Sequence, residues 1–104
     1  MRNTDMNTLI YEDKNEKLSG IRKKRSYMEI SVDILRVALE GAKKSHIVYK
    51  ANLNFKIVNG FLHSLLKSGL LDGPSHDRFY QTTQKGSDFI EYYESLEKFL
   101  EWMW

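Results

Sequence analysis

Two apolar segments, with a short turn between them and a glycine after the second, limit what this chain can fold into. The first segment ends at Ala51, Asn52-Leu53-Asn54 follows it, and a longer amphipathic segment then runs to Gly69. Asparagine tolerates left-handed backbone and caps helices well, whereas glycine commonly ends them. The pattern therefore predicts two helices joined by a tight turn, with Asn54 as the N-cap of the second.

The second of these helices, expected at about residues 55–68, has two different faces. Apolar side chains recur at the spacing of one helical face, at Val58, Phe61, Leu62 and Leu65. The opposite face carries Lys56, Asn59, His63 and Lys67. We expect the apolar face to be buried and the polar face to be presented to solvent or to a ligand.

A hairpin is expected directly after this helix. Leu70-Leu71 and residues 78–82 have the composition of short strands, and residues 72–77 between them are dense in turn formers, including the only proline of the chain. Helix, turn, helix and hairpin in this order are typical of a winged helix, an α+β fold whose usual ligand is double-stranded DNA. We therefore expect three helices, a two-stranded wing hairpin and a long C-terminal helix.

Cap signals place the remaining helices. Ser26 and Glu29 fit a capping box that opens a helix over about residues 27–40, which Gly41 closes. Residues 42–45 are expected to form a loop, with Ser45 capping a short helix at about residues 46–51. Thr83 is expected to cap the last helix, which reaches close to the C-terminus.

These elements divide the 104 residues into one domain and two flanking parts. Residues 1–25 lack periodicity, so we interpret them as a flexible basic N-terminal arm, which ends in Arg22-Lys23-Lys24-Arg25. Residues 26–82 are expected to form a winged helix-turn-helix DNA-binding domain. Residues 83–104 are expected to form a C-terminal dimerisation helix.

The last helix carries more apolar surface than one small core can cover. Phe89, Tyr93, Leu96, Leu100 and Met103 are spaced at heptad intervals, and Tyr92 and Phe99 add apolar surface beside them. Four glutamates supply the polar side, at Glu91, Glu94, Glu97 and Glu101. We expect part of the apolar surface to pair with a second copy of the chain, in a homodimer resembling a coiled coil.

The net charge of +2 hides an uneven distribution. Residues 1–85 hold 15 of the 16 Lys and Arg residues but only 9 of the 14 acids, whereas residues 86–104 hold one lysine and five acids. Such asymmetry suggests a basic working surface and a separate acidic element.

The exposed face of the second helix in the turn motif holds the main candidates for contact with DNA. Asn59 would read adenine, and Lys56 would reach guanine or a phosphate. Gly60 is unfavourable in mid-helix but would let the backbone approach closely. The alternative is an ordinary polar face of a surface helix. The candidate residues at this helix are Asn54, Lys56, Asn59, Gly60, His63 and Lys67.

Further candidate contacts surround that helix. Lys43, Lys44 and Ser45 precede the short first helix of the motif, where they would meet a phosphate or simply form a loop. Arg78, near the hairpin tip, would track the DNA backbone or minor groove. The cations Arg22, Lys23, Lys24 and Arg25 would enter a minor groove or lie on phosphates, or would serve only as a solvated linker.

Several classes of function find no support in the sequence. The chain has no cysteine, and its three histidines lie in different elements, so neither a zinc site nor any other metal site is expected. No nucleophile–base pairing or phosphate-cradling glycine loop suggests an enzyme, and no cofactor is expected. No apolar run approaches a membrane span and no secretory signal is visible, so we expect a cytoplasmic protein.

Two runs of residues resemble a known family. The first run is Tyr49-Lys50-Ala51-Asn52-Leu53, and the second consists of Tyr80, Thr83, Lys85 and Gly86. Between them lie Phe61-Leu62, Leu65 and Gly69-Leu70-Leu71, and Ile34-Leu35 precedes them all. Over about residues 26–101 the chain resembles the archaeal winged-helix family of predicted transcriptional regulators, which includes a small dimeric chromatin-type DNA-binding protein. The resemblance implies duplex DNA binding, no cofactor, and dimerisation through the C-terminal helix. The last helix is shorter than is usual in that family, and the second helix of the motif is poor in arginine.

Two functions from different classes follow from these observations. The first is a homodimeric double-stranded DNA-binding protein, either a transcriptional regulator or an architectural factor. The alternative is a winged-helix module that binds another protein through its aromatic, acidic last helix, since Trp102 and Trp104 are typical interface anchors.

Overall fold

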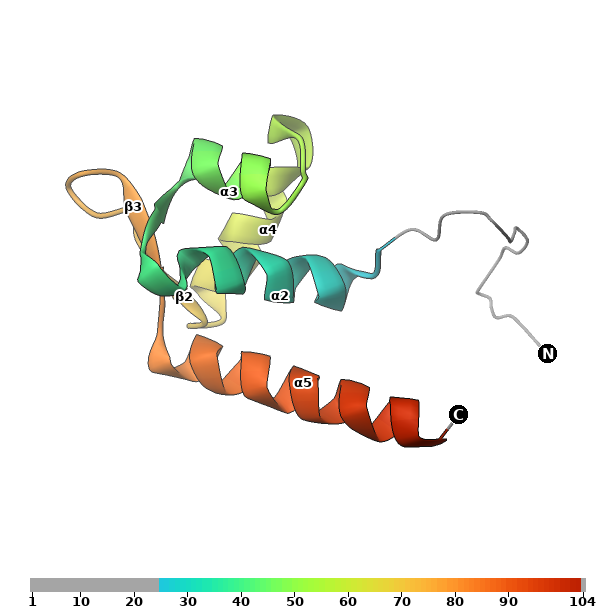
Figure 1. Ribbon diagram of the computed structural model, residues 1–104. Coiled ribbons are helices and arrows are strands. Elements are labelled where there is room, and N and C mark those ends of the chain that lie inside the picture. The colour runs from blue at the N-terminus through green and yellow to red at the C-terminus, as the bar shows by residue number, and fades with distance from the viewer. Residues whose placement is uncertain (1–24, 104) are drawn as a thin grey trace.

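A computed structural model of the protein describes residues 25–103, and Figure 1 shows how their elements are arranged. The helices are α2 (Tyr27–Val37), η1 (a 3-10 turn, Ala38–Glu40), α3 (Lys44–Lys50), α4 (Phe55–Lys67) and α5 (Gln84–Met103). The strands are β1 (Ala42–Lys43), β2 (Leu71–Asp72) and β3 (Phe79–Thr82). Helix α2 lies between α3 on one side and α5 on the other, and the β2–β3 hairpin projects at one end (Figure 1). This arrangement confirms the expected α+β winged helix.

The predicted capping box opens α2. The Ser26 hydroxyl accepts a hydrogen bond from the Glu29 N–H at 3.0 Å, and the Glu29 carboxylate accepts one from the Ser26 N–H at 2.8 Å. The α-helix ends at Val37, earlier than expected, because the last expected turn is the 3-10 turn η1. Gly41 follows η1 with a φ of 86°, so the chain changes direction there. At the other end of the helix, the capping box provides acceptors for the N–H groups of Ser26 and Glu29, which have no backbone partner within the helix.

The turn between α3 and α4 also follows its predicted chemistry. Asn52 has a φ of 56°, in the left-handed region that asparagine tolerates, and the Asn54 side chain accepts a hydrogen bond from the Ile57 N–H at 3.0 Å. At the other end of α4, Gly69 has a φ of 80°, and the Leu70 N–H reaches the Leu65 carbonyl at 3.0 Å. That pattern is a Schellman stop.

The segment expected as a loop at residues 42–45 is different in the structure. Ala42 and Lys43 form strand β1, which pairs with Tyr80 and Phe79 of β3, so the sheet has three antiparallel strands in the order β1-β3-β2. Helix α3 then starts at Lys44, with Lys43 as an N-cap that makes no side-chain hydrogen bond, and the predicted cap by Ser45 is wrong. A two-residue strand has no sequence period of its own, and β1 exists because the free edge of β3 accepts it.

The Tyr-x-x-Thr-x-Lys-Gly run joins the hairpin to α5, and each of its residues has a structural role. Tyr80 is buried, and the Thr83 hydroxyl accepts a hydrogen bond from the Gly86 N–H at 3.0 Å, which confirms the predicted cap. The Lys85 ammonium donates to the Ser68 carbonyl at 2.9 Å, at the carbonyl end of α4 where a cation is favoured. Gly86 is buried against Leu70. The run therefore fixes where α5 starts.

One hydrophobic core joins all the helices. Its largest fully buried side chains are Ile34, Leu35, Ile47, Leu71, Val32 and Val58, and Ile90 is the contribution of α5. The Thr82 hydroxyl is buried and donates to the Leu35 carbonyl at 2.6 Å, which ties the sheet to α2. No helix among residues 25–103 is long and apolar enough to cross a membrane.

Candidate nucleic-acid interface

Helix α4 presents its polar face to solvent. Val58, Leu62 and Leu65 are buried on its inner side. Helical spacing puts the predicted contact residues on the outer side. All five of them are exposed: Lys56, Asn59, Gly60, His63 and Lys67. The structure thus brings these candidates together on one surface, which we call the α4 face.

Asn54 lies at the amino end of the α4 face, but one of its polar atoms is already used. Its side-chain oxygen accepts the hydrogen bond from the Ile57 N–H that caps the helix. The amide nitrogen, which can donate to a base or phosphate, is not used by this cap. The role of Asn54 that the structure shows is capping of α4, and its contact with DNA stays a prediction.

Lys43 and the hairpin lie next to each other because β1 pairs with β3. Lys43 stands opposite Phe79 in the sheet, and its ammonium lies 5.6 Å from the centroid of the Phe79 ring, within the range of a cation–π interaction. Lys43 and Ser45 are exposed, and Lys44 is half-buried. Lys43 is therefore beside the hairpin, which the sequence alone did not indicate.

Arg78 occupies an unusual backbone position in the loop between β2 and β3. Its φ is 69°, in the left-handed region, which is unfavourable for a residue with a long side chain. The loop holds it there: the Arg78 N–H donates to the Ser75 carbonyl at 2.8 Å, and the Ser75 N–H donates to the Phe79 carbonyl at 2.8 Å. The Arg78 side chain itself is exposed.

Arg25 is bonded to the body of the protein. Its guanidinium forms an ion pair with Asp33 at 2.9 Å and donates to the Asn52 carbonyl at 2.9 Å. It therefore ties the start of α2 to the turn before α4, a role that sequence reasoning missed because Asp33 is eight residues away. Arg22, Lys23 and Lys24 lie outside the described residues.

The charged residues of the segment that forms α3 and α4 are of one sign. Residues 41–71 contain five lysines and no acid. The acids nearest in sequence are Glu40 before this segment and Asp72 after it, and the hairpin loop adds Asp77 beside Arg78. A segment of this length without a carboxylate gives the α4 face a positive potential, which favours a polyanionic partner.

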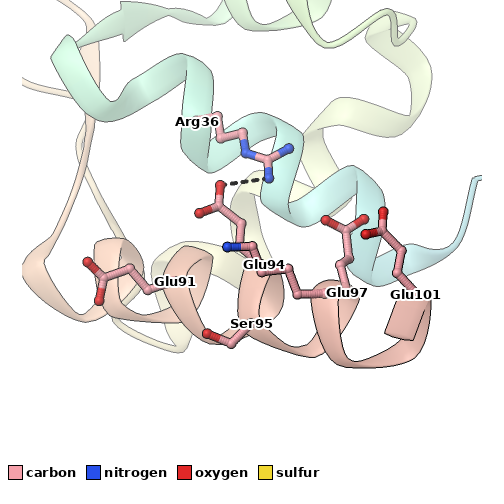
Figure 2. Close-up of a pocket in the computed structure, with 7 residues that line it drawn as sticks. Arg36, Glu91, Glu94, Ser95, Glu97 and Glu101 are labelled. Carbon is pink, nitrogen blue, oxygen red and sulfur yellow. Dashed lines mark hydrogen bonds and ion pairs between the residues drawn. The ribbon is translucent and has the colours of Figure 1, made fainter. Parts of the chain in front are cut away.

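A second surface, between α2 and α5, is acidic. Figure 2 shows the groove between α2 and α5, where Arg36 of α2 pairs with Glu94 of α5 at 2.9 Å. The other residues lining it are Glu91, Ser95, Glu97, Lys98 and Glu101. Burial, followed by the charges of Glu29 and Glu97, raises the pKa of the nearby Tyr93 phenol. This groove would repel a phosphate backbone, so it differs in electrostatic character from the α4 face.

Helix α5 leaves most of its predicted dimer seam uncovered. Phe89 and Tyr93 are half-buried against the core. Five other residues of the seam are exposed by 46% to 75%: Tyr92, Leu96, Phe99, Leu100 and Met103. Trp102 is 84% exposed. The carboxyl-terminal half of α5 therefore presents an apolar stripe that the described part of the chain does not cover.

Within residues 25–103, no group of three or more His, Cys, Asp or Glu side chains gathers in a way that could hold a metal ion.

Comparisons with known proteins agree with the geometry. A family model described as winged helix-turn-helix matches residues 24–101. No curated protein matches the chain. A similar solved structure is that of Sso10a-2, a DNA-binding protein from Sulfolobus solfataricus, with a TM-score of 0.68 and 31% sequence identity. The match covers 76% of this chain and 85% of that one.

Proposed function

The chain belongs to the winged helix-turn-helix family, and we propose that it is a double-stranded DNA-binding protein that acts as a homodimer. The observation that carries the proposal is the α4 face, an exposed helix surface of lysine, asparagine, glycine and histidine within 31 residues that contain no acid. The match to Sso10a-2 supports the same partner, because that protein is itself DNA-binding.

In the proposed complex, α4 lies in the major groove and the hairpin lies on the backbone or in the minor groove. Asn59 reads adenine, and Lys56 contacts guanine or a phosphate. Phosphate contacts come from Lys43, Lys44, Lys67 and Arg78, all of which are at least partly exposed. His63 lies on the α4 face between Gly60 and Lys67, and Ser45 follows Lys44 in α3. The basic run at residues 22–24 would extend this footprint.

The division of labour along the chain follows from this proposal. We end the basic arm at residue 24, because Arg25 is bonded to the body. Residues 26–82 bind DNA, and residues 83–104 hold two copies together in the cytoplasm. The α4 face contains no arginine, the residue that most often makes bidentate contacts with guanine. Most of the binding energy is therefore assigned to phosphates, which fits an architectural factor or a regulator with modest sequence preference.

Binding to duplex DNA is expected to weaken steeply as salt rises. Four phosphate-contacting cations in each protomer make eight in a dimer, so log K should fall with log salt with a slope of about −7. Affinity would then drop about 10⁴-fold between 50 and 200 mM salt. Fluorescence anisotropy with a labelled 24-base-pair duplex measures this slope, and the absence of binding at micromolar protein and low salt would refute the proposal.

Arg78 provides a more local test. Arg78→Gly relieves the left-handed backbone but removes a charge, so we expect the free energy of unfolding to change by less than about 1 kcal/mol. The affinity for DNA should fall about tenfold, and the salt slope should shrink by about 1 for each protomer. Arg78→Lys keeps the charge and is the matched control. If Arg78→Gly leaves both affinity and slope unchanged, the hairpin is not a DNA contact.

A second candidate function is docking of another protein on α5. The 84% exposure of Trp102, on the same helix as the uncovered apolar stripe, favours it. The oligomeric state separates the two readings, because a homodimer that buries this stripe leaves no surface for a different partner.

A further inference from the structure

Gly60 lies in the middle of α4 without any structural reason to be glycine. A side-chain carbon built on it would meet nothing within 4 Å. Its backbone is not in the left-handed region, unlike Gly41, Gly69 and Gly73. Alanine would fit the site and would form a better helix. In the free protein, then, the absent side chain is a loss of stability that no contact offsets.

The surroundings of Gly60 indicate where it would be an advantage. Lys56 is one turn before it, His63 is almost one turn after it, and Lys67 is two turns after it, all on the exposed α4 face. Gly60 is therefore a bare patch of helix surface between long or polar side chains. A bare patch on such a face allows a partner to come closer at this point than anywhere else along α4.

The chemistry of the patch limits what can fill it. Backbone N–H and carbonyl groups in mid-helix are already bonded to one another, so Gly60 offers only its Cα hydrogens. A surface of carbon and hydrogen is best matched by an apolar group. On the floor of the major groove, the apolar group is the C5-methyl of thymine. The neighbouring residue, Asn59, has the amide group that pairs with the adenine edge of the same type of base pair.

On the premise that the chain binds duplex DNA as proposed above, we propose that Asn59 and Gly60 read an A·T base pair. Asn59 bonds to adenine, and the thymine methyl occupies the space that a side chain at position 60 would take. Gly60→Ala places a second methyl in that space, so the two methyls clash. The prediction is a preference for A·T steps that does not depend on charge.

The test removes the methyl group from the DNA base, or adds a methyl group to the protein at position 60. Alternating A·T duplexes of 24 base pairs are prepared with thymine or with uracil, which lacks the C5-methyl, and an alternating G·C duplex serves as reference. Burial of one methyl corresponds to a factor of about 4 in affinity. The wild-type protein should bind the thymine duplex about fourfold more tightly per protomer than the uracil duplex, and more tightly than the G·C duplex. Gly60→Ala should reverse the order and prefer uracil.

Three controls separate this effect from changes in folding and in charge. Gly60→Ala should raise the melting temperature by about 5 °C, so weaker binding to thymine DNA is not loss of structure. Ser95→Ala, at an exposed position of α5, also improves a helix but should keep the thymine preference of the wild type. The salt slope of Gly60→Ala should equal that of the wild type, because no phosphate contact is removed.

Each outcome decides a separate question. If the wild-type protein binds duplexes but does not distinguish thymine from uracil, or if Gly60→Ala keeps the wild-type preference, the assignment of Asn59 and Gly60 is wrong while DNA binding stands. If the wild-type protein binds no duplex at low salt, the proposed function fails and this assignment fails with it.

Discussion

Gly86→Ala is expected to lower the free energy of unfolding by about 3 kcal/mol. A carbon built on Gly86 would overlap the main-chain carbonyl oxygen of Leu70 and lie 2.6 Å from the Thr82 methyl. A main-chain atom cannot rotate away as a flexible side chain can. The overlap can therefore be removed only if α5 moves away from Leu70, in the segment that follows α4. Urea denaturation followed by circular dichroism measures the change.

Gly60→Ala is the matched control, because it makes the same chemical change in mid-helix with the opposite expected sign. The space beside Gly60 is open, whereas Gly86 is buried beside Leu70 and Thr82. We therefore expect Gly60→Ala to be more stable than the wild type by roughly 0.5 to 1 kcal/mol. A Gly86→Ala protein within 0.5 kcal/mol of the wild type would contradict the close packing of α5 on Leu70.

The double substitution Leu96→Glu with Leu100→Glu is expected to convert a dimer to a monomer and to weaken DNA binding about 100-fold. Both leucines are 46% exposed, so their replacement should leave the monomer core intact. Two carboxylates in the apolar stripe would face the same stripe of the second copy, where burial of a charge is unfavourable. A monomer also loses the gain that comes from two linked binding sites. Light scattering gives the mass, and anisotropy gives the affinity.

Lys98→Glu is the control for this pair of changes. It also alters the net charge by −2, but Lys98 lines the polar groove between α2 and α5 rather than the apolar stripe. The Lys98→Glu protein should remain a dimer and lose only a small part of its affinity, through long-range repulsion. If the wild-type protein is itself a stable monomer at micromolar concentration, the homodimer proposal is refuted and docking of another protein on α5 is favoured.

Local hydrogen bonding explains why much of the fold could be predicted. Ser26, Asn54 and Thr83 cap helices as expected, and Gly69 ends α4 as expected. Each of these features depends on residues within five positions of one another, so the sequence contains the whole interaction. The apolar period of α4 likewise identified its buried face, because helical geometry alone relates spacing to direction.

Contacts between distant residues account for what could not be predicted. Strand β1 forms because β3, more than thirty residues later, has a free edge. The basic run predicts an arm position for Arg25, yet Arg25 pairs with Asp33 and with the Asn52 carbonyl in the turn before α4. The sequence predicts no individual role for Lys85, yet its ammonium donates to the Ser68 carbonyl at the end of α4. None of these partners is marked by a local pattern.

The candidate DNA-binding surface divides in the same way. The sequence by itself determined the helix-turn-helix and the face of α4 that carries Lys56, Asn59 and His63, because residue spacing is a property of the chain. It also determined that residues 41–71 contain no acid. Only the tertiary structure decided that Gly60 faces open space while Gly86 is crowded, that Lys43 stands beside the hairpin, and that the acidic groove lies along α5. The physical reason is that a side chain's type is fixed by its codon, whereas its neighbours are fixed by packing between segments far apart in sequence.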